Sequence, residues 1–342
     1  MKINVSIFGV SGYTGAQLLS ILSHHSNVNI VSIFGEASVG KKINQIYPNF
    51  KNLPDLTIQK SEMFKRKSND ISFFCLPHKK SQNLIKSFDF KRVIDLAADF
   101  RINNENDYFE WYDSKHDCPE KLKNFTYGLT ELNRNKIMNS NFVANPGCYP
   151  TSVLIPLIPL LKKRKISNFN SIIIDSKSGV SGAGKKLSEE NIFSEINENF
   201  QAYNVSKHRH LGEIKQELKK YKNKLSVTFV PHLLPTTRGI LSTIYLKSCG
   251  VDIKELRRFY NDFFCDESFI SILDEGVYPN IKNVNGTNKL SFNIFTDYEN
   301  DQLIIVSCID NLIKGASGQA VQNMNLMFEL KENQALDIIQ TF

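Results

Sequence analysis

Hydrophobic residues in the first part of the chain fall into short runs separated by polar, glycine-containing segments. Residues 3–8, 29–34, 71–76 and 92–97 have the pattern of buried strands, and residues 15–23 have the spacing of a helix. Strands that alternate with helices are typical of parallel βαβ units. This part of the chain therefore predicts an α/β fold with a doubly wound parallel sheet.

The pattern changes after Cys148. Five strand-like runs rich in β-branched residues follow with few helical patterns between them, at residues 171–175, 226–230, 240–246, 289–295 and 303–308. Such a succession favours a mainly antiparallel sheet. A last helical pattern covers residues 317–330. We expect two domains with a boundary near Cys148.

Composition narrows the function class. The chain has 342 residues and a net charge of +7 that is spread along it, which is far from the basic stripe of a nucleic-acid binder. The longest apolar run, residues 153–161, contains two prolines and is too short to span a membrane. The six cysteines show no metal-ligand or disulfide spacing. We expect a cytoplasmic protein with no bound metal, no membrane segment and no signal peptide.

Three glycines directly follow the first predicted strand and open the first predicted helix. Gly9, Gly12 and Gly15 have the spacing G-x-x-G-x-x-G, a variant of the common dinucleotide-binding turn. Glycines let the backbone turn tightly near a pyrophosphate, and the N–H groups of the helix start attract that anion. His24 and His25 end this helix, and we interpret them as surface residues.

One cysteine differs from the others in its setting. Cys148 lies in the segment NPGCYPT, directly before a helix-like run, where helix N–H dipoles favour a thiolate. Cys75 and Cys308 lie inside apolar strands and read as core residues. The sequence therefore favours Cys148 as a nucleophile.

Several polar groups are candidates for the remaining chemistry. His208 and His210 flank an arginine and are suited to proton transfer and anion binding, or they are surface residues before a helix. His78 follows a predicted strand at the edge where doubly wound sheets bind ligands. The loop 178–186 and the guanidinium groups of Arg101 and Arg238 are suited to phosphate or carboxylate.

Taken together, seven segments resemble the N-acetyl-γ-glutamyl-phosphate reductase family. They occur in the family's order and span almost the whole chain: residues 9–15, 95–101 (DLAADFR), 145–151 (NPGCYPT), 178–186 (SGVSGAGKK), 208–214 (HRHLGEI), 231–240 (PHLLPTTRGI) and 314–325 (KGASGQAVQNMN). The resemblance implies a Rossmann-type dinucleotide-binding domain, residues 1–147, completed by the C-terminal helix 315–342. It also implies an α+β catalytic and oligomerisation domain at residues 148–314, and a dimer or tetramer.

The resemblance further implies the reaction and the site. Cys148 attacks an acyl phosphate, expels inorganic phosphate and forms a thioester, which NADPH reduces to an aldehyde. We expect His210 to transfer protons and His208 to position the substrate, although the resemblance does not fix this division. The expected substrate ligands are Arg101, Asn145, Tyr203, His208 and Arg238. The expected cofactor ligands are Gly9, Ser11, Gly12, Tyr13, Thr14, Gly15, Ser38, Lys41, Pro77, Ser181, Gly182 and Asn323.

Two departures from the family pattern are visible. Leu211 and Gly212 replace the usual continuation of the histidine motif, which alters only the start of a helix. Glu36 stands where family members often carry arginine for the 2′-phosphate of NADPH, so NADH is a second, less favoured cofactor. The alternative functions are the same chemistry on aspartyl or N-acetyl-aminoadipyl phosphate, or a Rossmann-type binding protein without catalysis.

Overall fold

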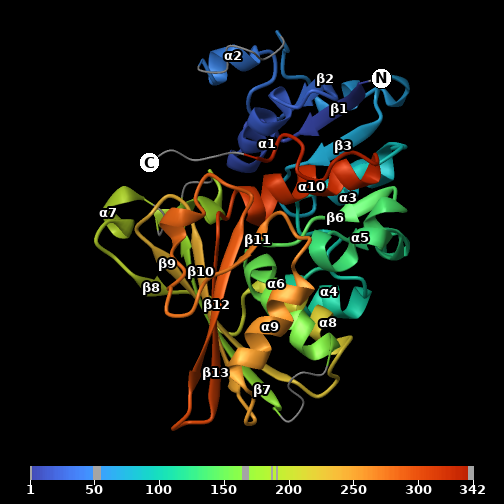
Figure 1. Cartoon of the computed structure of the whole chain (residues 1–342). Coiled ribbons are helices and arrows are strands. Elements are labelled where there is room, and N and C mark those ends of the chain that lie inside the picture. The colour runs from blue at the N-terminus through green and yellow to red at the C-terminus, as the bar shows by residue number, and fades with distance from the viewer. Residues whose placement is uncertain (1, 49–54, 164–168, 186–187, 190–191, 338–342) are drawn as a thin grey trace. The chain divides into compact units, whose positions relative to one another are not determined.

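The computed structural model describes residues 2–48, 55–163, 169–185, 188–189 and 192–337 (Figure 1). These residues form two units. One contains the described residues up to Pro146 together with residues 316–337, and the other contains those from Gly147 to Gly315. We call them the nucleotide unit and the catalytic unit, after the roles that the resemblance implies. None of the helices in the described ranges is long and apolar enough to cross a membrane.

The nucleotide unit is built on a six-stranded parallel sheet with the order β2-β1-β3-β4-β6-β5. Its strands are β1 (Ile3–Phe8), β2 (Val28–Phe34), β3 (Ile71–Phe74), β4 (Val93–Asp95), β5 (Thr126–Tyr127) and β6 (Phe142–Ala144). The predicted doubly wound sheet is confirmed. The chain goes from β1 outward to β2 and then returns to β3 on the other side of β1. This creates a switch point at the carboxyl ends of β1 and β3, where such sheets bind ligands.

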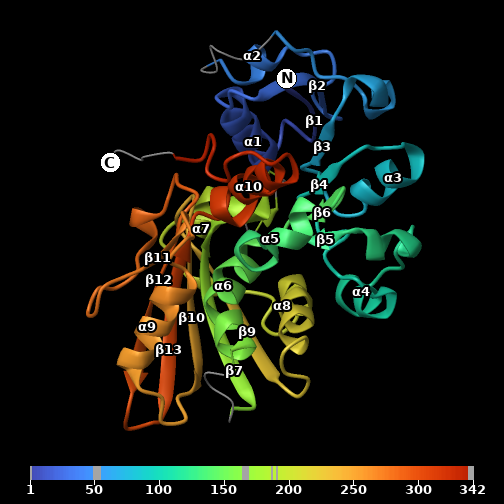
Figure 2. The same ribbon diagram turned by 45° about the vertical axis from the view of Figure 1, so that its right-hand side comes forward.

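The described residues of this unit also form α-helices. They are α1 (Tyr13–Ser23), α2 (Ile43–Ile46), α3 (Lys80–Ser87), α4 (Glu105–Tyr112), α5 (Thr130–Met138) and α10 (Gly318–Met327). The C-terminal α10 packs against α1 and α5 (Figure 2). His25 is buried at the end of α1, and its Nε2 lies 2.9 Å from Oδ1 of Asn325 on α10. The interpretation of His25 as a surface residue was wrong, because a helix some 300 residues later covers it.

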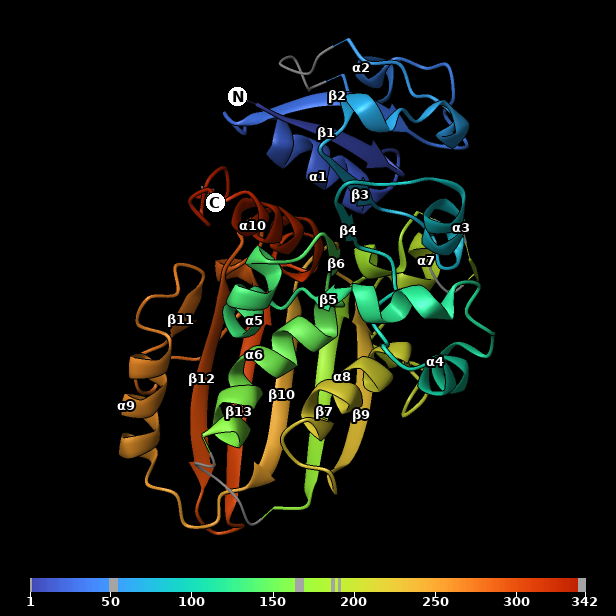
Figure 3. The same ribbon diagram turned by 90° about the vertical axis from the view of Figure 1, so that its right-hand side faces the viewer.

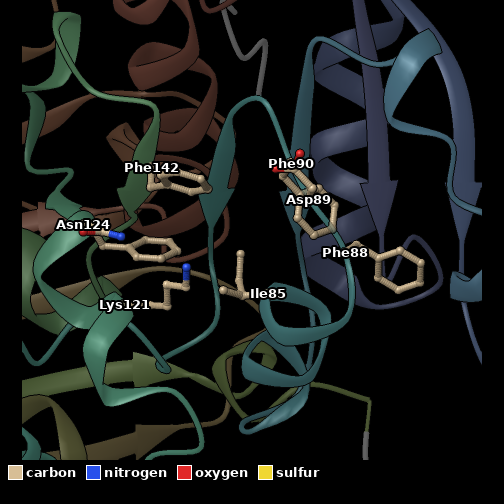
Figure 4. Close-up of a pocket in the computed structure, with 8 residues that line it drawn as sticks. Ile85, Phe88, Asp89, Phe90, Lys121, Asn124 and Phe142 are labelled. Atoms are coloured by element: carbon tan, nitrogen blue, oxygen red, sulfur yellow. The ribbon is translucent and has the colours of Figure 1, made fainter.

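A small cavity of about 90 Å³ lies in the nucleotide unit (Figure 4). Aromatic side chains line much of it, among them Phe90 before β4 and Phe142 at the start of β6. Asp89, Lys121 and Asn124 are the polar residues that line it. The cavity is thus at the amino ends of these strands, away from the edge at which doubly wound sheets bind ligands.

The catalytic unit is built on a seven-stranded sheet with the order β11-β12-β13-β10-β7-β9-β8. Its strands are β7 (Ser171–Gly179), β8 (Gln201–Ala202), β9 (Ser226–Leu234), β10 (Ile240–Lys247), β11 (Ile270–Ile272), β12 (Leu290–Asp297) and β13 (Gln302–Ile309). Only the β7–β9 and β11–β12 pairs are parallel. The prediction of a mainly antiparallel sheet is confirmed.

Three helices cover one face of this sheet: α6 (Cys148–Lys162), α8 (Arg209–Lys219) and α9 (Ile253–Phe263) (Figure 3). The short helix α7 (Phe193–Ile196) belongs to the same unit. Helix α6 is almost entirely buried although it contains Pro156 and Pro159. Pro156 has no N–H to donate to the carbonyl of Ser152, and the hydroxyl of Ser307 on β13 donates to that carbonyl instead, at 2.6 Å. Packing against the sheet therefore supports a helix that its prolines weaken.

Candidate active site

The glycine turn after β1 has the geometry that its spacing predicts. Gly9 has φ +83°, and a Cβ at this position would lie 2.2 Å from the carbonyl oxygen of Cys75. A Cβ on Gly15 would lie 2.3 Å from the carbonyl oxygen of Gly9. Both glycines are therefore required by close backbone approach. The turn brings Ser11 and Gly12 directly to the switch point beside β3.

Helix α1 begins at this turn. Gly12 is its N-cap and offers no side-chain acceptor, and the first turn contains no acidic residue. Tyr13 and Thr14 lie in the first turn, and Ser317 donates a hydrogen bond to the carbonyl of Thr14 at 2.9 Å. The N–H groups and positive dipole end of this helix suit an anion. These residues fit the pyrophosphate of a dinucleotide.

The loop after β2 carries charges of both signs. Glu36 lies 3.3 Å from Nζ of Lys80, the first residue of α3, and both side chains are largely solvent-exposed. Ser38 and the exposed Lys41 follow, and the Lys41 N–H donates to the Ser38 carbonyl at 3.2 Å. Because β1 lies between β2 and β3, the Glu36–Lys80 pair spans the strand that ends in the glycine turn.

His78 follows the exposed Pro77 after β3 and is held by a buried carboxylate. Its Nδ1 lies 2.7 Å from Oδ1 of Asp99, and its ring stacks on Tyr112. Burial alone would raise the pKa of Asp99, but hydrogen bonds from His78 and from the Lys79 N–H lower it overall. His78 is thus fixed at the carboxyl edge of the sheet.

Two predicted ligands, Asn145 and Asn323, belong to one buried network in the nucleotide unit. Nδ2 of Asn323 donates to the carbonyl of Gly128 at 2.8 Å and to Oδ1 of Asn145 at 3.2 Å, and its Oδ1 accepts from Thr130. Arg101 is only 8% exposed, and its Nε donates to the Asn145 carbonyl at 2.8 Å. These contacts fix the backbone that leads to Pro146.

In the catalytic unit, Cys148 is the first residue of α6, directly after the N-cap residue Gly147. Its side chain is partly exposed at the amino end of the helix, where the N–H groups point towards it. By contrast, Cys308 is buried in β13, and burial raises the pKa of its thiol to about 12. Burial also raises the pKa of the Cys75 thiol, with Asp95 adding to the effect. Cys148 is therefore in the more reactive setting.

His210 packs directly on the residue before the cysteine. A Cβ on Gly147 would lie 2.5 Å from Nε2 of His210, so the imidazole occupies the space that any larger residue would need. Glu213, one turn later on α8, is fully buried and accepts the Gly147 N–H at 2.8 Å. Two side chains from successive turns at the start of α8 therefore hold residue 147.

His208 is the N-cap of α8, and its Nδ1 accepts the backbone N–H of His210 at 3.1 Å. Burial, together with the neighbouring Arg209, lowers the pKa of His208 to about 4. His208 is therefore neutral at neutral pH. Because Nδ1 is an acceptor, the ring proton is on Nε2, which makes that atom a hydrogen-bond donor.

Two tyrosines lie close to the histidines. The hydroxyl of Tyr149 lies 3.0 Å from that of Tyr203, and His208 packs edge-on against both rings. Burial raises the pKa of both, that of Tyr203 to about 12. Tyr203 was among the expected substrate ligands, whereas Tyr149 was not, although it directly follows the expected nucleophile Cys148.

The predicted glycine-rich loop is tied to the segment that carries Arg238. The Ser181 N–H donates to the carbonyl of Thr237 at 3.1 Å, and its hydroxyl accepts from Asn311 at 2.8 Å, whereas Gly182 is exposed. A guanidinium nitrogen of Arg238 lies 3.4 Å from the buried carboxylate of Asp310. Residue 186, the end of this predicted loop, lies outside the described residues.

Two family models and many named proteins match the sequence of this chain. Residues 4–140 match the family model described as the NAD binding domain of semialdehyde dehydrogenase, and residues 148–311 match its dimerisation domain. The N-acetyl-gamma-glutamyl-phosphate reductase of Pelotomaculum thermopropionicum is 45% identical over 98% of both chains. That of Geotalea daltonii is 44% identical over 99% of both chains.

Solved structures show the same fold at low identity. Aspartate semialdehyde dehydrogenase II of Vibrio cholerae, complexed with ASA, has a TM-score of 0.72 at 19% identity and covers 96% of this chain and 99% of its own. Aspartate semialdehyde dehydrogenase from Candida albicans, solved with NADP, has a TM-score of 0.69 at 17% identity, covering 99% of this chain and 100% of its own.

The resemblance found in the sequence is therefore confirmed, and the chain is a nicotinamide-dependent oxidoreductase. With a glycine turn built for a dinucleotide and a cysteine at a helix start beside a histidine pair, the chain belongs to the N-acetyl-gamma-glutamyl-phosphate reductase family of semialdehyde dehydrogenases.

Proposed function

We propose that the chain reduces N-acetyl-L-glutamyl 5-phosphate to N-acetyl-L-glutamate 5-semialdehyde, with release of phosphate, as a step of arginine biosynthesis. The observation that carries this proposal is Cys148 at the first turn of α6 with His210 packed on Gly147. Support comes from full-length relatives of that name at 43–45% identity.

The reaction proceeds through a thioester on Cys148. The thiolate attacks the acyl carbon, the bond from that carbon to the phosphate oxygen breaks, and inorganic phosphate leaves. A nicotinamide cofactor, when bound, would supply the hydride that reduces the thioester carbon. The resulting thiohemiacetal gives its hydroxyl proton back to His210 and loses its C–S bond, which releases the aldehyde and returns the sulfur as a thiolate.

His210 is the proposed proton-transfer group. It takes the thiol proton of Cys148 and protonates the oxygen that becomes negative after reduction. His208 has a pKa of about 4 and uses Nδ1 as a cap, which suits it to hold substrate through its Nε2–H. Tyr203 and Arg238 are the further proposed substrate ligands in this unit. Arg101 and Asn145 are those of the nucleotide unit.

NADPH is the proposed cofactor, with NADH a weaker one because of Glu36. Lys41 and Ser38 follow Glu36 and offer a cation and a hydroxyl to the 2′-phosphate. Ser181, Gly182 and Asn323 remain proposed cofactor ligands. We also propose that the enzyme forms a homo-oligomer and acts in the cytoplasm; none of its six cysteines, all in the described residues, is in a disulfide.

The reverse reaction gives the test. N-acetylglutamate semialdehyde, inorganic phosphate and NADP⁺ should produce NADPH, measured by its absorbance, and omission of phosphate should stop it. Aspartate semialdehyde and N-acetyl-aminoadipate semialdehyde should give kcat/KM values at least about tenfold lower, because each differs in chain length or N-acetylation. A higher kcat/KM with either of them would assign the enzyme to that substrate, and no turnover with any of the three would refute the proposal.

A further inference from the structure

Glu213 is a buried carboxylate that the proposed reaction does not use. It lies on α8 one turn after His210, and its side chain is fully buried. Its Oε1 accepts the N–H of Gly147 at 2.8 Å, a contact between residues 66 positions apart. Placing a carboxylate out of water is costly unless hydrogen bonds compensate it, so this contact is a specific feature of the unit.

Residue 147 is the point at which α6 and α8 meet. Gly147 is the N-cap of α6, and the next residue is Cys148. The imidazole of His210 packs on the Cα side of Gly147, while Glu213 holds its N–H. Two side chains of α8 therefore hold Gly147, the residue directly before the cysteine. His210 does so by contact and Glu213 by a hydrogen bond.

We propose that Glu213 is a positioning residue: its acceptor oxygen fixes the Gly147–Cys148 turn against α8 and so keeps His210 at the distance from Cys148 that activates the thiol. This inference rests on the proposed roles of Cys148 and His210. A misplacement of about 1 Å between catalytic groups can lower a rate about 10²-fold, which is the scale expected for turnover when this anchor is lost.

Two conservative substitutions of Glu213 separate the position of its acceptor oxygen from its charge. Glu213→Gln keeps the length of the side chain and an acceptor oxygen but removes the charge. Glu213→Asp keeps the charge but withdraws the acceptor by one methylene. If positioning is what matters, Glu213→Gln behaves like the parent enzyme and Glu213→Asp does not.

The measurement is the rate at which iodoacetamide alkylates Cys148, followed at the peptide level by mass spectrometry because Cys249 and Cys265 are also exposed. Thiolate is the reacting form, so the rate reports activation of this thiol. We expect Glu213→Asp to lower the rate at neutral pH about tenfold, because a thiol without activation has a pKa of about 8.5 and is still a few per cent thiolate at that pH, and Glu213→Gln to stay within about threefold of the parent. Alkylation needs no substrate, so it is independent of which acyl phosphate the enzyme reduces.

Two controls complete the design. Glu217→Asp makes the same change one turn later on α8, at a buried glutamate that pairs with Lys220, and should leave the rate unchanged. In a variant that already carries His210→Asn, adding Glu213→Asp should change the alkylation rate of Cys148 by less than about threefold, because the imidazole that Glu213 positions is absent. An equal loss in both backgrounds, or a greater loss in Glu213→Gln than in Glu213→Asp, would overturn the proposal.

Discussion

Sulfur at position 148 is the residue-level feature on which the proposed reaction depends. The helix start of α6 stabilises a thiolate, whereas a serine hydroxyl there would remain protonated. We expect Cys148→Ser to lower turnover by several orders of magnitude while NADP⁺ still binds, because an unactivated hydroxyl is a poor nucleophile. Stopped-flow turnover and fluorescence titration of the cofactor give the two readouts. Near-parent turnover would exclude the thioester mechanism.

The two histidines of the motif differ in their surroundings, which predicts different kinetic effects. His210 packs on Gly147, and its replacement by asparagine should lower kcat about 10²–10⁴-fold. His208→Asn preserves a capping side chain and should mainly raise KM for the substrate. Steady-state kinetics of both variants decide the division. If His208→Asn abolishes turnover and His210→Asn does not, the roles are reversed.

We propose that the charge of Glu36 influences cofactor choice at the residue level. A carboxylate near the 2′-phosphate of NADPH would repel it, and Glu36 also pairs with Lys80, a cation that follows β3. Glu36→Arg should raise the ratio of kcat/KM for NADPH over NADH. The arginine would bind the phosphate, and the loss of the Glu36 carboxylate would leave Lys80 without this partner. Affinities for NADP⁺ and NAD⁺ from calorimetry should shift in the same direction. An unchanged ratio would show that residue 36 lies away from the phosphate.

At the scale of elements, α8 depends on an unusual cap. Histidine is not a preferred N-cap residue, yet Nδ1 of His208 accepts the His210 N–H and the ring remains neutral. Since the pKa of His208 is about 4 in the folded protein and about 6.5 unfolded, the unfolded state binds a proton first as the pH falls. The contribution of His208 to the free energy of unfolding is fully present above about pH 6.5 and is lost progressively as the pH falls to about 4.

Because His208 caps α8 only when its ring is neutral, we expect the free energy of unfolding to depend on pH, and His208→Asn to remove this dependence. Asparagine caps a helix without titrating, so His208→Asn should lose less stability than the parent between neutral pH and about pH 5, by up to about 2 kcal/mol. Urea unfolding at both pH values measures the difference. Identical pH dependence in the two proteins would show that His208 does not titrate as an isolated buried group.

At the scale of the whole molecule, helices α6, α8 and α9 cover one face of the sheet in the catalytic unit, and strand register shows a row of apolar side chains on the other face. Strand register places Ile173, Tyr245, Ile304 and Phe295 in one row across four strands. The adjacent residues Ile172 and Ile174 point to the opposite face of the sheet and are buried, whereas Ile173 is 48% exposed. The family model of this unit is described as a dimerisation domain, which makes a second copy of the chain the expected partner of this row.

A single charge in this row should dissociate the oligomer. Burying a lysine at position 173 against a second copy leaves an unpaired charge in an apolar interface, so Ile173→Lys should shift the mass in solution towards the monomer. Light scattering coupled to size exclusion measures that mass. Phe109→Lys, which places the same charge on an exposed residue of α4, is the matched control. If the parent mass persists in Ile173→Lys, the oligomer uses another surface.

Local signals made much of the architecture predictable. The strand at residues 3–8 was predicted to the residue, and β2, β10 and β13 were predicted to within one residue at each end, because apolar runs bounded by turn residues are unambiguous there. The glycine turn and the start of α6 were likewise readable, since each needs a particular residue at a particular place. Helix α9 was missed although its buried Leu256 and Tyr260 have helical spacing.

Patterns along the chain were enough to predict the local elements and the alternating fold of the first part, and to single out Cys148 as the proposed nucleophile. Which distant groups meet was set by packing: Glu213 with Gly147, Tyr203 with Tyr149, and His25 with Asn325. The physical reason is that turns, caps and periodicity depend on neighbours along the chain. Contacts across many residues depend instead on strand order and helix packing, which fix the burial and the protonation of each side chain.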